Sequence, residues 1–70
     1  MDTKHGIHMT TRDRVLLAWE DSMELVRDFQ SYANEIEDDK KVYEVFKEFA
    51  EDEGLHASKL LEILKEYDAK

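Results

Sequence analysis

The residues of this chain best suited to chemistry are Glu53 and His56, which are spaced as Glu-x-x-His. They interrupt an apolar stripe with steps of four and three, which runs Val42, Phe46, Phe49, Glu53, His56, Leu60, Ile63 and Tyr67. Residues at this spacing share one face of a helix, so both polar residues occupy core positions. A carboxylate removed from water must find a partner, a proton or a metal ion. The stripe therefore predicts a buried polar layer that is either paired internally or bound to metal.

Composition limits what such a layer can belong to. The chain has 70 residues and no cysteine, which indicates one small domain without disulfides or thiolate metal sites. Lys and Arg number 10 against 18 Asp and Glu, and the resulting net charge of -8 repels phosphate backbones and anionic lipid headgroups. No apolar run approaches the roughly 20 residues that span a bilayer. We therefore expect an acidic cytoplasmic protein with neither nucleic acid nor membrane as a partner.

The first nine residues carry no periodicity, so we expect residues 1–9 to form a disordered leader. His5 and His8 in this segment could bind a metal. The His8-Met9 junction is also what a common cloning site leaves before a native start codon, so the native chain is expected to begin at Met9.

Two long helices are expected after this leader. The pattern Thr-x-x-Asp from Thr10 to Asp13 is a variant of the capping box, and four-three apolar spacing then continues to about Glu37. Helix one is predicted over residues 11–37 and helix two over residues 39–68, with Asp38 or Asp39 as its N-cap. A connection this short requires an antiparallel two-helix hairpin, which is an all-α fold.

Each helix has more apolar surface than one partner helix can cover. On helix two, a flanking row lies beside the main stripe, and it consists of Tyr43, Ala50, Ala57 and Leu64. An exposed apolar patch of this size usually marks an association surface. We expect a homodimer in which two hairpins form one four-helix bundle. Folding the hairpin at Asp38-Asp39 places Ser22 beside His56, with Glu53 one turn away, so the core polarity falls in one layer.

At this layer the chain resembles a known family. The segment Phe46-Lys-Glu-Phe-Ala-Glu-Asp-Glu-Gly-Leu-His-Ala-Ser-Lys-Leu-Leu61 looks like the second helix of a rubrerythrin-like or ferritin-like half-bundle, and the resemblance covers residues from about 12 to 67. It implies that Glu53 and His56 bind iron or another divalent metal. It also implies an oxidoreductase that reduces peroxide and draws electrons from a separate donor, because the family's cysteine-bearing donor domain has no counterpart in this chain.

The family also places a ligand glutamate on helix one, and here the chain departs from the pattern. Ser22 stands where the alignment of Phe29 and Ala33 puts that glutamate. Glu20 is the alternative ligand, although it lies about 120° from the centre of the apolar face at 100° per residue. Glu53, His56 and Glu20 are thus the candidate metal ligands, with Ser22 favoured as the core position.

A second hypothesis assigns no chemistry to the layer. Glu53 and His56 could form a structural pair that fixes the register of the bundle, in the way a buried polar residue does in a coiled coil. The chain would then be a non-catalytic helical module for dimerisation or partner binding. Whether the protein is an enzyme stays open at this point.

Overall fold

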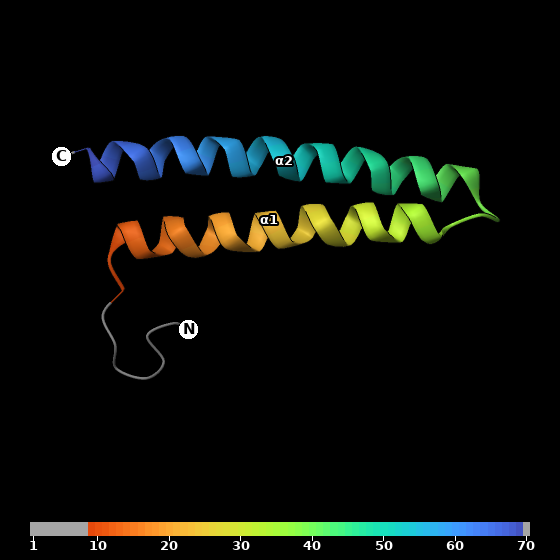
Figure 1. The fold of residues 1–70 in the computed structure, drawn as a ribbon, viewed down its shortest axis with the longest axis horizontal. Helices are drawn as coiled ribbons and strands as arrows, with labels where there is room; N and C mark the ends of the chain where they lie inside the picture. The colour runs from red at the N-terminus through yellow and green to blue at the C-terminus, as the bar shows by residue number, and fades with distance from the viewer. Residues whose placement is uncertain (1–8, 70) are drawn as a thin grey trace.

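The computed structural model describes residues 9–69, and these form two long antiparallel helices, α1 (Thr11–Glu35) and α2 (Lys40–Asp68) (Figure 1). The predicted all-α hairpin is therefore confirmed. Residues 1–8, which include most of the expected leader with His5 and His8, lie outside the described residues. Within the described part, neither helix is long and apolar enough to cross a membrane.

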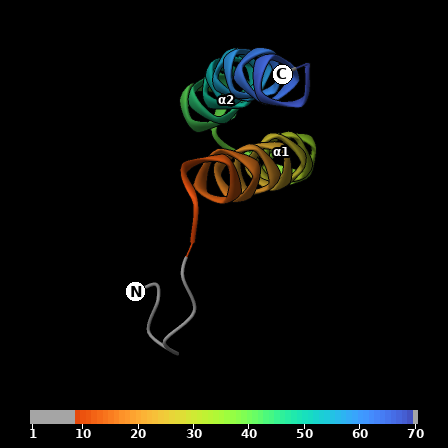
Figure 2. The same ribbon diagram turned by 90° about the vertical axis from the view of Figure 1, so that its left-hand side faces the viewer.

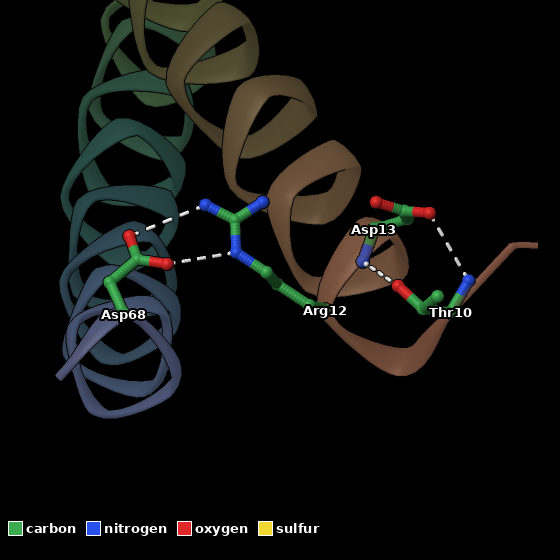
Figure 3. A network of polar contacts seen from close by, with 4 residues as sticks. All are labelled: Thr10, Arg12, Asp13 and Asp68. Carbon is green, nitrogen blue, oxygen red and sulfur yellow. Dashed lines mark hydrogen bonds and ion pairs between the residues drawn. The ribbon is translucent and has the colours of Figure 1, made fainter. Parts of the chain in front are cut away.

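Helix α1 begins at the capping box that the sequence predicts. The hydroxyl of Thr10 accepts a hydrogen bond from the Asp13 backbone N–H at 3.0 Å, and the Asp13 carboxylate accepts one from the Thr10 N–H at 3.2 Å (Figure 3). Two of the N–H groups that a helix start leaves without a partner are thereby satisfied.

The connection between the helices is longer than expected because α1 ends at Glu35 rather than near Glu37. Ile36 adopts an extended conformation with φ -88° and ψ 117°. Acidic residues follow it, and negative charge is unfavourable at the carbonyl end of a helix. Asp39 is the N-cap of α2, and its carboxylate accepts a hydrogen bond from the Val42 N–H at 3.1 Å.

Small side chains form the centre of the contact between the helices. The buried apolar residues of the described chain are Ala33 of α1 and Ala50, Ala57 and Leu64 of α2. The three residues of α2 are seven apart, so they lie in one row along the helix. No large side chain in the described residues is fully buried. The two helices form a single layer whose broad sides are not covered by the described chain (Figure 2).

The open end of the hairpin is joined by an ion pair. The Arg12 guanidinium donates hydrogen bonds to both carboxylate oxygens of Asp68, at 2.9 Å and 3.3 Å (Figure 3). These hydrogen bonds are the main reason why the pKa of Asp68 lies below its ordinary value and that of Arg12 above its own. The pair links the first turn of α1 to the last turn of α2.

Candidate functional site

The predicted polar layer lies at the middle of the hairpin. Phe29 contacts Phe49 with ring centroids 5.7 Å apart, and Tyr32 contacts Phe46 at 5.7 Å. This is the register that the sequence predicts. Seven residues further along each helix, the same register puts Ser22 at the level of His56. Met23 is the central residue of the 25-residue α1 and Gly54 that of the 29-residue α2. The candidate site therefore sits at half the length of both helices.

Glu53 and His56 lie together on α2, one turn apart. The His56 Nδ1 atom is 3.6 Å from the Glu53 Oε1 atom, an ion-pair contact that is longer than an ordinary hydrogen bond. The Glu53 side chain is 22% exposed and that of His56 is 66% exposed. The pair thus starts at the edge of the helix–helix contact and extends outward onto one broad side of the hairpin.

The structure differs here from the expected centre of the helix-two stripe. The flanking row of Ala50, Ala57 and Leu64 faces α1, whereas Phe49 and His56 of the main stripe are exposed. Alanine side chains let two helix backbones approach, which a phenylalanine at the same position would prevent. The hairpin consequently places His56 outside its own core.

Helix one presents Ser22, and not Glu20, to the contact with α2. Ser22 is 9% exposed and is the buried polar residue of the described chain, while Glu20 is exposed. The predicted phase of this helix is therefore confirmed. The structure does not bring Glu20 to Glu53 and His56, because the two sites lie on different sides of the hairpin at 100° per residue.

A shallow hollow of about 330 Å³ adjoins the Glu53–His56 pair. It is lined by Phe29, Phe49, Asp52, Glu53 and His56. Asp52 is not among the site residues that the sequence pattern predicts. The spacing could have identified it, because Asp52 and His56 are four residues apart and residues four apart on a helix are neighbours. The hollow thus combines two aromatic walls with two carboxylates and an imidazole.

The donors available in one chain do not complete a metal site. Within residues 9–69 there is no group of three or more His, Cys, Asp or Glu side chains close enough to hold an ion. No buried side-chain nitrogen or oxygen of these residues lacks a hydrogen-bond partner. Structural zinc sites use four protein ligands, and Ca²⁺ takes six or more oxygens. Glu53 and His56 supply two protein donors, which is fewer than either kind of site uses.

The two broad sides of the hairpin differ in character. The residues that directly precede the buried apolar ones are Tyr32, Phe49, His56 and Ile63, and those that directly follow them are Asn34, Glu51, Ser58 and Lys65. A step of one residue turns a helix by about 100°, so preceding and following residues point to opposite broad sides. One side is therefore aromatic and apolar around His56, whereas the other combines polar groups with apolar residues such as Val26 and Tyr43.

We call the first side the aromatic face. It is defined by Leu25, Phe29 and Tyr32 of α1 and by Val42, Phe49 and His56 of α2. Four of these apolar side chains, Leu25, Tyr32, Val42 and Phe49, are between 38% and 48% exposed. The opposite side carries a groove of about 530 Å³ with mixed lining, in which Gln30, Asn34, Lys47 and Glu51 provide polar groups.

Comparison of the chain with models of protein families, with curated proteins and with solved structures found no match.

Proposed function

We propose that this protein binds a divalent metal ion, iron or one of similar coordination preference, between two copies of the chain. Each copy contributes Glu53 and His56 to a polar layer in a ferritin-like four-helix bundle. The observation that supports this proposal is the position of a Glu–His pair, with Asp52 beside it, in the middle of a largely apolar, uncovered face. Covering that face would remove both side chains from water, and a cation would offset the cost of burying the carboxylates.

The donor set is appropriate for such an ion. Imidazole nitrogen suits iron, zinc and cobalt, and carboxylate oxygen extends the range toward manganese. Two chains bring two carboxylates and two imidazoles, which is enough for one four-coordinate ion. The expected stoichiometry is therefore about one ion for two chains. Peroxide reduction with a separate electron donor stays an expectation drawn from the family resemblance.

Metal titration tests the proposal directly. Calorimetry with cobaltous ion, and with ferrous ion under anaerobic conditions, should give saturation near one ion per two chains. All proteins should carry His5→Ala and His8→Ala, so that the histidines of the first eight residues do not contribute. Glu53→Ala and His56→Ala should each abolish the binding. Glu20→Ala, which removes an exposed carboxylate from α1, is the matched control and should leave it unchanged.

One observation favours the second candidate function, a non-catalytic association module. Glu53 and His56 already pair with each other at 3.6 Å, so a buried layer could be satisfied without an ion. In that case both single alanine variants should destabilise the bundle, because each leaves one buried partner unpaired. A double change of Glu53 and His56 to leucine should then be neutral or stabilising. Absence of metal binding together with this order of stabilities would replace the metal proposal by the module.

A further inference from the structure

We infer that the aromatic face is the surface on which a second copy of this chain docks, and that the groove of mixed lining on the opposite side stays in contact with solvent. This inference rests on the proposed function in that it specifies where the partner's Glu53 and His56 come from. It makes the candidate site a shared one, because one copy alone holds only half of the donors.

The need for a covering layer follows from what the hairpin leaves exposed. The buried apolar residues of the described chain are three alanines and one leucine, and no large side chain is fully buried. Domains are stabilised by packing at least two layers around a core. Short chains bury a smaller fraction of their surface on folding than long ones do, so they are only marginally stable. Two helices in one layer enclose too little apolar surface to be stable alone. Burying the exposed Phe49, Tyr32 and Leu25 would supply the missing core.

The area of the aromatic face matches what a stable dimer needs. At 1.5 Å per residue the helices are about 40 Å long, and two helices side by side are roughly 20 Å wide, so the face covers about 800 Å². Specific protein interfaces bury about 800 Å² on each partner. The whole length of the hairpin is therefore required for the contact, and a full-length overlap is the expected arrangement.

Full-length overlap with a second copy has a particular consequence for the site. Closed dimers are related by a two-fold axis, so that one patch meets the same patch of the partner. Glu53 and His56 lie at half the length of the hairpin. Two copies overlapping over their full length therefore bring both Glu–His pairs to the same level, whether the axis runs along the helices or across them. A pair near one end would meet its symmetry mate in only one of these arrangements.

The face also has the two kinds of relief that a contact with a copy of itself needs. It carries both projecting side chains, such as the 45% exposed Phe49, and the hollow of about 330 Å³ between Phe29, Phe49 and His56. A patch that meets itself must contain both projections and hollows. The groove on the opposite side has Gln30, Asn34, Lys47 and Glu51 in its lining. These groups would lose water in a contact and need new partners.

Cross-linking distinguishes the two sides of the hairpin. The chain has no cysteine, so a single introduced one is the only reactive thiol. His56→Cys and Ser58→Cys are a matched pair, because both positions are exposed and flank the buried Ala57 on opposite sides. A short bismaleimide should convert His56→Cys largely to a covalent dimer and leave Ser58→Cys monomeric. Cross-linking at position 58 alone, at both positions equally, or at neither would overturn the inference.

Solution mass provides an independent measurement on the same face. Sedimentation equilibrium of the parent should give the mass of two chains. Phe49→Glu should reduce it to that of one chain, or unfold the protein, which circular dichroism would show as a loss of helix. Leu55→Glu is the matched control, since Leu55 is an apolar residue of α2 that is 69% exposed and lies outside the aromatic face. It should keep the dimer and the helix content. A monomeric, folded parent, or a Phe49→Glu variant that stays dimeric, would overturn the inference.

These measurements separate the docking face from the metal proposal. A parent that is dimeric but binds no metal, together with a His56→Cys variant that cross-links, would refute the metal site and leave the docking face standing. A parent that binds metal as a monomer would refute both the docking face and the sharing of the ion between two copies.

Discussion

At the scale of single residues, the ion pair between Arg12 and Asp68 is the feature with a definite pH dependence. Hydrogen bonds from the guanidinium hold the pKa of Asp68 below the ordinary value of 3.8. A carboxyl group whose pKa is lowered by folding stabilises the folded state above the unfolded pKa. That contribution is lost as the pH falls through the lowered pKa. Both side chains are well exposed, so the effect is expected to be small.

We therefore expect Asp68→Asn to lower the melting temperature slightly at pH 7. The difference from the parent should shrink below about pH 3.8 and vanish once Asp68 is protonated in the folded parent. Thermal melts of both proteins between pH 7 and pH 2, monitored by circular dichroism, measure this. Glu24→Gln is the control, because it removes a similar charge from an exposed position of α1. A difference that persists unchanged at the lowest pH would show that the ion pair is not its cause.

The side chains of Glu53 and His56, also considered as single residues, lie in different environments. The Glu53 side chain is mostly covered by the hairpin, whereas most of the His56 side chain is open to solvent. A contact of 3.6 Å in which one partner is open to solvent contributes little to stability. The effect of the Glu53–His56 contact on stability therefore depends on what covers His56. The metal titration and the cross-linking experiment both test whether a second copy covers it.

At the scale of the helix, Gly54 is the residue of α2 that the hairpin does not explain. A Cβ atom at this position would meet no atom within 4 Å, so close packing inside the hairpin does not require glycine. Glycine in a helix interior costs about 1 kcal/mol relative to alanine. The position lies in the lining of the groove opposite the aromatic face.

Gly54→Ala should accordingly raise the free energy of unfolding by roughly 1 kcal/mol, because alanine has the higher helix propensity. Urea denaturation at fixed protein concentration measures the change. The dimer mass and the cross-linking at position 56 should be unaffected, since the groove is expected to face solvent. A loss of stability or of the dimer on adding one methyl group would instead indicate a close neighbour at Gly54 from outside the chain.

At the scale of the whole molecule, stability and association are expected to be one property. The hairpin exposes large apolar side chains over one entire side, and no large side chain of residues 9–69 is fully buried. If the second copy supplies the missing layer, folding is coupled to dimerisation. Mass action then makes the apparent stability depend on protein concentration.

The melting temperature of the parent should thus rise with each tenfold increase in protein concentration, from low micromolar to high micromolar. Differential scanning calorimetry and circular dichroism in cells of different path length cover this range. Addition of cobaltous ion should raise the melting temperature further in the parent and not in His56→Ala. A melting temperature that is independent of concentration would show that the hairpin is stable on its own.

Much of this architecture was determined by the sequence alone. The spacing of apolar residues predicts both helices, the Thr-x-x-Asp pattern predicts the start of α1, and the short acidic connection requires the antiparallel hairpin and its register. These features are local, because they depend on helix periodicity, capping groups and the reach of a few residues. The same rules predict that Ser22, Glu53 and His56 lie at about the same height along the hairpin.

Only the tertiary structure decided which part of each apolar face is used inside the hairpin. The apolar arc of α2 is wider than one helix can cover, so periodicity defines the arc and not the line of contact within it. The row of Ala50, Ala57 and Leu64 takes that line, since small side chains allow the helices to approach closely. Phe49 and His56, which lie next to this row in the same arc, are left on the open aromatic face as a result.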